Sequence, residues 1–222
     1  MCGRFTLYST EQVLINEYAI ENSFTYEESF NIAPSQRVLA IINNGKKNRA
    51  GQLLWGLIPP WAKDKKIAYK MINARGETLA EKPSFKRAFQ SRRCIIPTSG
   101  FYEWKRTEDG KKKPYFIHLK NNKLFAFAGL WEKWNDPATE EDIFTCTIVT
   151  TAPNEMMANL HDRMPLLLEN KHQDDWLNPD IKDTDYLQQL VKPFPSEHMT
   201  AYEVSTAVNK PTHNGSELIE PI

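Results

Sequence analysis

The sequence has few cysteines, no long apolar run and no excess of charge of either sign. Only three of its 222 residues are cysteine, at positions 2, 94 and 146. This odd, widely spaced set offers neither a disulfide framework nor the ligand spacing of a metal site. No apolar stretch approaches the roughly 18 residues of a transmembrane helix, and the N-terminus lacks the layout of a signal peptide. We therefore expect a reducing, cytoplasmic location, with no metal, cofactor or membrane partner.

The composition is that of a globular domain. Hydrophobic residues make up 41% of the chain and charged residues 25%, which is typical of a folded domain with one sizeable core. Repeats, low-complexity tracts and linkers are lacking. Many strand-like segments alternate with short helical ones at the margins, so we predict a single α+β domain over residues 1–222. Its core is expected to be a largely antiparallel, barrel-like β-sheet with peripheral helices.

Local patterns predict the individual elements. A capping box at Ser9 and Gln12 predicts a helix over 9–20, and the turn signal after Asn43 predicts a hairpin of strands 37–43 and 51–59. The stretch 93–105 is expected to be a strand that breaks at Pro97 and then resumes. Composition predicts further strands at 114–120, 124–134, 144–152 and 199–205, and further helices at 84–93, 154–160, 174–178 and 184–191.

The zero net charge hides an uneven distribution. Residues 43–75 contain eight lysines and arginines and one acid, whereas residues 169–222 contain ten acids and four bases. The segment "KPSFKRAFQSRR" adds five bases and no acid. A basic face with an acidic flank suits a polyanion-binding protein, although a solvated surface of fluctuating charge explains the counts equally well.

Three stretches carry polar residues that secondary structure does not explain. They are "INARGET", with Asn73 and Arg75; "GFYEW", with Glu103 between two aromatic residues; and "HDRMP", with His161. A carboxylate among aromatic residues is partly desolvated, which raises its pKa and suits it to acid–base chemistry. The plainer interpretations are an exposed glutamate on a polar strand face and a structural histidine.

The ordered set of short motifs resembles one family. The motifs are "MCGRF", "NIAPSQ", "WGLIPPWA", "INARGET", "RRCIIPTSGFYEWK", "HDRMP" and "NGSELIEPI". In this order, and with a cysteine at position 2, they resemble the SRAP (SOS-response-associated peptidase) family of abasic-site processing proteins. The resemblance runs from residue 2 to the last residues. It implies the SRAP fold, a role in the DNA damage response, and a DNA-damage substrate for the basic surface.

The resemblance also implies a reaction for Cys2. Members of the family lose Met1 and use the bared cysteine to capture abasic sites in single-stranded DNA, forming a thiazolidine cross-link by lyase-type chemistry. An α-amine (pKa about 8) and a thiol (about 8.5) are usable nucleophiles near neutral pH without drastic tuning. An internal cysteine would give only a reversible hemithioacetal, because its nitrogen is part of an amide. The chemistry therefore requires the cysteine to follow the initiator methionine.

Further residues match the family's motifs. By this match Glu103 performs the proton transfers, His161 hydrogen-bonds the opened sugar, and Asn73 positions the cysteine and the lesion. Phosphate contacts fall to Arg75, Arg163 and Arg4, because the guanidinium fork suits phosphate. Trp61 is expected to stack on or wedge beside a base, with Pro34 packing there too. Trp61 is followed by Ala62, where some relatives carry paired tryptophans, and the segment 63–70 is unusually basic.

Two other classes of function remain open. A thiol peptidase that processes its own N-terminus would use Cys2, Glu103 and His161, but it explains neither the basic surface nor a use for the α-amine. A passive binder of single-stranded nucleic acid explains the surface but not Cys2. Covalent capture explains both. We expect a monomer, because the charged surface gives no sign of an obligate dimer, and association with the nucleoid when DNA is bound.

Overall fold

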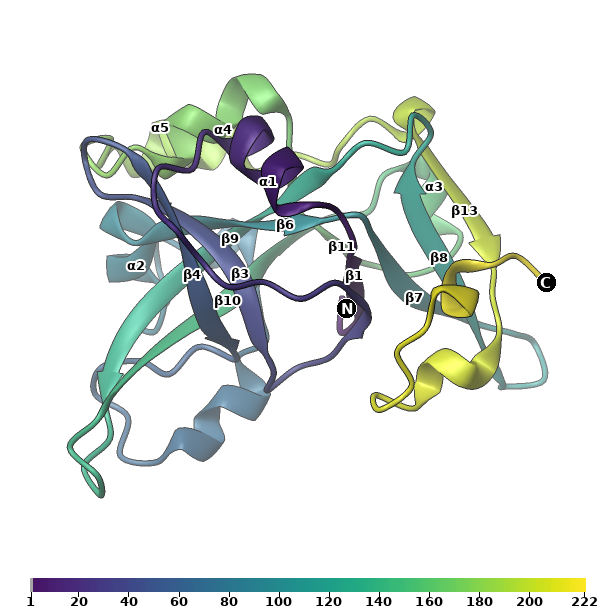
Figure 1. The fold of residues 1–222 in the computed structure, drawn as a ribbon, viewed down its shortest axis with the longest axis horizontal. Coiled ribbons are helices and arrows are strands. Elements are labelled where there is room, and N and C mark those ends of the chain that lie inside the picture. Colours follow the sequence, from purple (N-terminus) through teal and green to yellow (C-terminus); the bar gives the residue numbers. More distant parts are fainter. Residues whose placement is uncertain (1) are drawn as a thin grey trace.

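The centre of the molecule is a β-barrel in which one sheet closes on itself (Figure 1). The computed structural model describes residues 2–222. In the ring, β10 pairs with β4, β4 with β3, β3 with β6, β6 with β9, and β9 with β10 again. All of these pairs are antiparallel except β4–β10, which is parallel. The strands are β3 (Arg37–Asn43), β4 (Asn48–Trp55), β6 (Arg93–Thr98), β9 (Phe125–Asn135) and β10 (Asp142–Thr151).

A second sheet, which is antiparallel, packs against the barrel. Its strand order is β13-β8-β7-β1-β2. The strands are β1 (Phe5–Leu7), β2 (Ser29–Ile32), β7 (Gly100–Arg106), β8 (Lys112–Leu119) and β13 (Met199–Glu203). Three short strands, β5 (Asn73–Arg75), β11 (Met164–Pro165) and β12 (Leu167–Leu168), extend the barrel sheet. The predicted fold class, a single domain with a barrel-like and largely antiparallel core, is confirmed.

Short helices lie around these sheets, and none among residues 2–222 is long and apolar enough to cross a membrane. Figure 1 shows α1, α4 and α5 at one end of the barrel and η1 at the other. The α-helices are α1 (Glu11–Tyr18), α2 (Lys86–Ser91), α3 (Glu155–Ala158), α4 (Asn170–Leu177) and α5 (Thr184–Gln189). The 3₁₀ helices are η1 (Lys65–Lys70), η2 (Gly76–Thr78), η3 (Ser196–His198), η4 (Thr206–Asn209) and η5 (Ser216–Ile219).

Aromatic residues from both sheets pack together in the core. The Phe5 ring of β1 lies edge-on to Trp55 and to Phe127, with ring centroids 5.2 and 5.6 Å apart. The core-packing interpretation of Trp55 is confirmed, because this residue is fully buried. Gly100 lies where the chain passes from β6 into β7, and a Cβ there would come within 2.2 Å of the Phe116 ring. Phe116 belongs to β8, the neighbouring strand of the same sheet, and its ring occupies this space because residue 100 has no side chain.

Most of the predicted elements are confirmed, with two corrections. The β3–β4 hairpin forms as expected, with Asn43 opposite Asn48. The cap of α1 is Thr10 rather than Ser9, since the Thr10 hydroxyl accepts a hydrogen bond from the Val13 N–H. The break predicted at Pro97 was also wrong: β6 continues to Thr98. Because β3 pairs with β6 only at Ile95, no backbone donor is needed from Pro97 on that side.

Hydrogen bonds from two of the sequence motifs, "NIAPSQ" and "NGSELIEPI", hold the C-terminal segment against the N-terminal strands. The buried Asn31 side chain donates to the carbonyls of Val208, Lys210 and His213, at 3.3, 2.9 and 2.6 Å. In return, Asn214 Oδ1 accepts hydrogen bonds from the Phe30 N–H and from the Ser29 hydroxyl. We call this network the clasp (residues 29–31 with 208–214). It fixes the chain end beside β1 and β2.

Replacing Asn31 with alanine should destabilise the fold. The change removes the donor to three carbonyl groups and the acceptor of the Arg4 guanidinium, and each unsatisfied buried polar group costs about 1–3 kcal/mol. We expect a loss of about 2–4 kcal/mol in the free energy of unfolding. In urea titrations the midpoint should fall while the m-value stays constant. The exposed helical Asn16→Ala is the control, and equal midpoints for the two variants would contradict a stabilising clasp.

Candidate active site

The register of β1 against β7 brings Cys2 beside Glu103. Phe5 pairs with Phe101, and the N–H of Tyr102 donates to the Arg4 carbonyl at 2.9 Å. Continuing this antiparallel register sets Gly3 opposite Glu103, so Cys2 lies next to the same carboxylate. Cys2 and Glu103 are both buried, at 0% and 2% exposure. The N-terminal segment therefore enters the interior as an extension of a strand.

Asn73 holds Cys2 from the barrel side. It is the first residue of β5, whose position is fixed by parallel pairing with β10. Its Nδ2 donates to the Cys2 carbonyl at 2.8 Å. Its Oδ1 is buried and accepts no hydrogen bond from any of residues 2–222. The amide oxygen is therefore available as an acceptor for a donor on a bound ligand.

His161 reaches the site from the loop between α3 and β11. Its backbone N–H donates to the Met157 carbonyl at 2.8 Å. The ring Nδ1 lies 2.7 Å from Asp162 Oδ1 and 3.1 Å from the Arg163 backbone nitrogen, and these two neighbours fix its orientation. Three segments far apart in sequence thus meet at one point, as the motifs predict: the N-terminus, β7 and the 161–163 loop.

Electrostatic interactions link Glu103 to Cys2 and to His161. Burial raises the pKa of the Glu103 carboxyl, and the charge of a protonated His161 acts in the opposite direction. Burial, reinforced by the Glu103 charge, raises the pKa of the Cys2 thiol well above its ordinary value. A buried carboxyl with a raised pKa is a stronger base and can accept a proton from a neighbouring nucleophile. The thiol itself is protonated at neutral pH and needs such a base.

A cavity of about 320 Å³ opens onto Glu103 and His161. It is lined by Glu103, Trp104, Arg106, Lys112, Leu160, His161 and Asp162. Among the described residues, this lining includes neither Cys2, which is fully buried, nor Asn73, which is half-buried. Larger cavities of about 480 and 410 Å³ lie elsewhere and contain none of the predicted site residues. The smaller cavity is the candidate site because it joins solvent to the acid–base pair.

Two of the predicted phosphate contacts lie close together but differ in their surroundings. Arg75 is exposed at the end of β5. Arg163 donates two parallel hydrogen bonds to the Glu77 carboxylate, at 2.7 and 2.8 Å, and a third to the Thr150 carbonyl. Its ion pair lowers the pKa of Glu77. Arg75 is thus accessible to a ligand, whereas Arg163 already has a carboxylate partner; the phosphate role of each stays a prediction.

Arg4 is hydrogen-bonded to the clasp rather than free on an open surface. Its guanidinium donates to Asn31 Oδ1 at 2.6 Å and to the Val208 carbonyl at 2.5 Å. It also lies over the Trp104 ring, 5.8 Å from the centroid. Burial lowers the pKa of Arg4. These contacts connect the strand that carries Cys2 to the C-terminal segment, and the predicted phosphate role of Arg4 stays a prediction.

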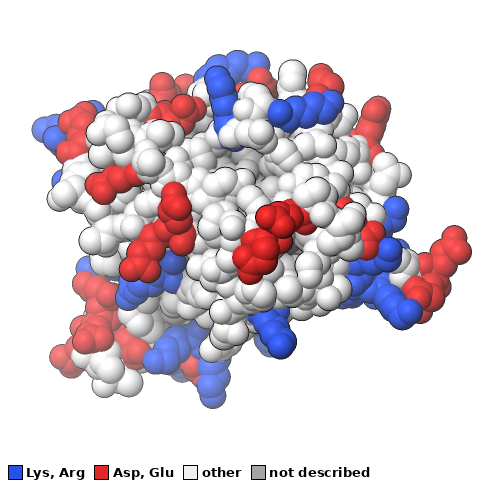
Figure 2. Space-filling model, turned by 45° about the vertical axis from the view of Figure 1, so that its right-hand side comes forward, with Lys and Arg blue, Asp and Glu red and all other residues white. Residues whose placement is uncertain are grey.

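Trp61 is exposed, as a base-stacking role requires. It is 59% exposed in the segment 59–70, together with Tyr69 at 68% and four lysines, Lys63, Lys65, Lys66 and Lys70. Pro34 is partly buried, and the next residue, Ser35, donates its N–H to the Trp55 carbonyl at 2.8 Å. Pro34 therefore lies near the end of β4, from which the segment 59–70 departs. Figure 2 shows lysines and arginines around the rim of one face, whose centre is mostly neutral with a few acidic side chains.

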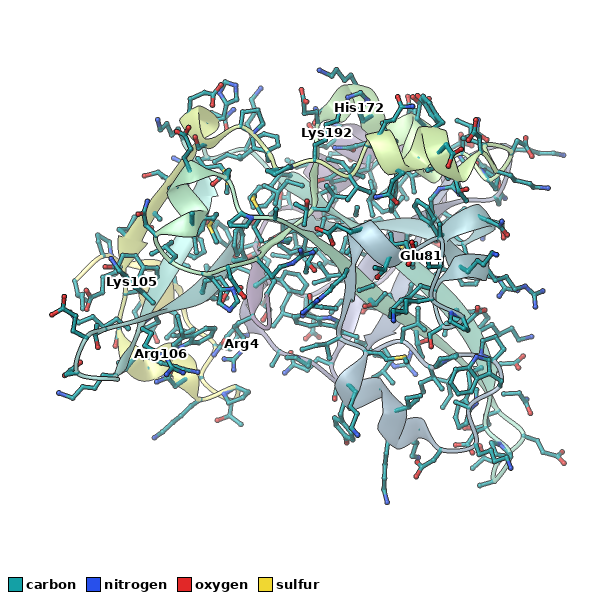
Figure 3. The ribbon with its side chains drawn as sticks, turned by 180° about the vertical axis from the view of Figure 1, so that it is seen from behind. Arg4, Glu81, Lys105, Arg106, His172 and Lys192 are labelled. Atoms are coloured by element: carbon teal, nitrogen blue, oxygen red, sulfur yellow. The ribbon has the colours of Figure 1, made fainter. Side chains whose placement is uncertain are left out.

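Sequence reasoning missed three exposed residues: Tyr69 in the segment 59–70, and Arg106 and Lys112 at the cavity. Arg106 and Lys112 line the cavity that exposes Glu103, and Figure 3 shows Arg4, Lys105 and Arg106 at the same end of the molecule. The signal for the last two was their spacing. They stand at equal distances from the centre of the "TEDGK" turn, which makes them partners across the β7–β8 hairpin.

Comparisons with known proteins agree with one another. The family model described as SOS response associated peptidase (SRAP) matches residues 1–211. The abasic site processing protein YoqW of Bacillus subtilis is 55% identical over 99% of both chains, and the abasic site processing protein HMCES of Xenopus tropicalis is 29% identical over 90% of this chain and 68% of its own. A crystal structure of a Bacteroides thetaiotaomicron protein superposes with a TM-score of 0.91 at 27% identity, covering all of both chains.

Proposed function

The chain belongs to the SOS response associated peptidase (SRAP) family, and from this premise we propose that it captures abasic sites in single-stranded DNA covalently through Cys2. Curated relatives named abasic site processing proteins support the processing of abasic sites. The covalent step is supported by one observation above all. Cys2, which follows the initiator methionine, lies against a buried glutamate whose pKa is raised and which interacts with a histidine.

The proposed reaction has two bond-forming steps after loss of Met1. The neutral α-amine of Cys2 attacks the C1′ aldehyde of the ring-opened deoxyribose, and loss of one water gives an imine. Cys2 Sγ then adds to the imine carbon, and its proton passes to the imine nitrogen, which closes a thiazolidine ring. The product weighs protein plus DNA less one water. Each step moves a proton, so a positioned acid–base group should accelerate both.

Roles for the neighbouring residues follow from their contacts. Glu103 transfers protons during ring opening, imine formation and thiol addition, because it is buried next to the nucleophile. His161 hydrogen-bonds the hydroxyl of the opened sugar. Asn73 holds the cysteine through its carbonyl, and its buried Oδ1 accepts a hydrogen bond from the sugar. Trp61, with Pro34 behind it, stacks on a base next to the lesion.

Arg75→Ala should weaken binding to all single-stranded DNA. Arg75 is exposed and follows Asn73 by two residues on β5, and a phosphate contact contributes through release of counterions. We expect about fivefold lower affinity at low salt, and a slope of log K against log salt that is shallower by about 0.7. Fluorescence anisotropy at several salt concentrations measures both quantities. The exposed Arg49→Ala on β4 is the control, and an unchanged slope for Arg75→Ala would place the groove elsewhere.

Intact-mass spectrometry tests the proposed function most directly. The purified protein is weighed before and after mixing with a single-stranded oligonucleotide that contains one abasic site. We expect a free protein without Met1 and a heat-stable adduct at the mass of protein plus DNA less one water. An oligonucleotide with a tetrahydrofuran residue, which has no aldehyde, is the control. A retained methionine and no adduct would refute capture through Cys2.

A second candidate function is thiol-dependent release of Met1 by the chain itself. It is favoured by the same observation, since Cys2 lies beside Glu103 and near His161. The reaction would cleave the Met1–Cys2 peptide bond with one water. If it occurs, purified Glu103→Ala should retain Met1 while the wild type from the same host has lost it. Equal loss of Met1 from both proteins would assign the cleavage to a host aminopeptidase.

A further inference from the structure

The β7–β8 hairpin carries two basic side chains at the mouth of the candidate site. Arg106 and Lys112 line the cavity that also exposes Glu103 and His161. They are exposed and directly opposite each other in the antiparallel register. Like charges in this arrangement destabilise a sheet. The hairpin thus keeps an unfavourable pair at a position where the pair faces the site.

Two lysines of the same hairpin have carboxylate partners, but Arg106 and Lys112 have none among the described residues. Lys113 forms an ion pair with Glu203 at 3.0 Å, and Lys111 forms one with Asp109 at 3.0 Å. Within residues 2–222, neither Arg106 nor Lys112 has an ion-pair partner. An anion bound between them would relieve their repulsion, and the guanidinium fork is well suited to a phosphodiester.

Distance along the strand limits which phosphate these residues can reach. Arg106 follows Glu103 by three residues on β7, which at about 3.3 Å per residue is about 10 Å. A strand whose abasic sugar lies at Glu103 would thus bring a phosphate within a nucleotide or two of the lesion to this pair. The hairpin therefore serves one flank of the lesion.

The other flank has a different basic surface. Figure 1 shows the β7–β8 hairpin and η1 on opposite sides of β1. The segment 59–70, which includes η1, combines the exposed Trp61 and Tyr69 with four lysines. Basic side chains interleaved with aromatic ones are typical of surfaces that bind single-stranded nucleic acid.

We propose that Arg106 and Lys112 bind the phosphodiesters on one side of the abasic residue, while the segment 59–70 binds the strand on the other side. This inference rests on the proposed function. The DNA strand then crosses the cavity mouth from hairpin to η1, and each basic surface recognises a different flank. The two surfaces are separable, because they lie on opposite sides of β1 and share no residue.

Two half-length oligonucleotides test this arrangement. Each carries a tetrahydrofuran residue at one end, so that only the 5′ flank or only the 3′ flank is present, and non-covalent affinity is measured against salt. We expect the double variant R106Q/K112Q to weaken binding of one oligonucleotide about tenfold, with a slope shallower by about 1.4, and to leave the other within twofold. K65Q/K66Q should show the reverse preference. The exposed pair K120Q/K123Q, in the turn that follows the other end of β8, removes the same charge as a control.

Control variants and a parallel cross-linking assay distinguish loss of stability, failure of the two-flank binding and failure of the covalent chemistry. R106Q/K112Q should be at least as heat-stable as wild type, because it removes a like-charge pair, and R106K/K112R should keep the affinity. Equal weakening of both oligonucleotides, or of neither, would overturn the proposal. Cross-linking of the wild type to a full-length abasic oligonucleotide is measured in parallel. If that cross-link is missing while the flank preferences hold, the covalent chemistry fails and the two-sided groove stands.

Discussion

Replacing Cys2 with serine is expected to abolish the heat-stable adduct. The variant keeps the α-amine, so it can still form an imine with the aldehyde of the abasic sugar. A hydroxyl is a far weaker nucleophile than a thiol, and the imine stays open and hydrolyses on heating. We expect roughly 100-fold less adduct after heating than for the wild type. Denaturing gels of heated and unheated mixtures measure this difference.

Chemical trapping makes this result specific. Borohydride reduces an imine to a secondary amine, so its addition should rescue a stable adduct for Cys2→Ser. The other buried cysteines provide matched controls: Cys94→Ala and Cys146→Ala should retain the adduct, since neither lies at the site. A heat-stable adduct of Cys2→Ser without borohydride would contradict ring closure by the thiol. Failure of borohydride trapping would instead exclude the imine.

Glu103→Gln is expected to slow cross-linking by roughly 10²- to 10⁴-fold, the usual contribution of a general acid–base group. Glutamine keeps the shape of the side chain, so the affinity for a tetrahydrofuran oligonucleotide should change less than twofold. Single-turnover rates measure the first quantity and anisotropy the second. The exposed Glu108→Gln, on the same hairpin, is the control. Equal losses of rate and affinity would point to a folding defect rather than to lost proton transfer.

The pH dependence gives a second readout for Glu103. Because burial raises the pKa of this carboxyl, the group becomes protonated at a higher pH than an ordinary glutamate. As a base it acts only when ionised, so the wild-type rate should fall as the pH drops through this raised pKa. The variant lacks that group and should lose the corresponding acid limb. An identical profile for both proteins would assign the proton transfers to another residue.

Local sequence patterns predicted the elements better than their connections. Strand composition and the turn after Asn43 predicted the β3–β4 hairpin, because its contacts are close in sequence. The parallel pairing of β10 with β4 and β5 joins segments that are far apart, and no local pattern specifies it. Pro97 was misjudged for the same reason. Whether a proline interrupts a strand depends on the neighbouring strand, which only the fold determines.

For the candidate site too, the site residues were predicted, but their long-range contacts were not. The structure brings Cys2, Asn73, Glu103 and His161 together. The resemblance of the ordered motifs to one family had already assigned these four residues to a single site. The intramolecular partners of the arginines were not visible in the sequence. Arg163 binds Glu77, 86 residues away, and Arg4 binds the Val208 carbonyl, 204 residues away. Such partners are set by tertiary folding, so the match to the family's motifs predicted phosphate contacts for both arginines without indicating the partners they have within the chain.

Burial of Cys2 has a consequence for the order of events during synthesis. Translation proceeds from the N-terminus at about 5–20 residues per second, so His161 leaves the ribosome roughly 10 to 30 s after Cys2. Glu103 and the clasp residues near Val208 also come later than Cys2. In the finished fold the Cys2 side chain has no exposed surface. An enzyme that trims the nascent chain therefore meets an accessible N-terminus first, and folding then encloses the thiol in the site.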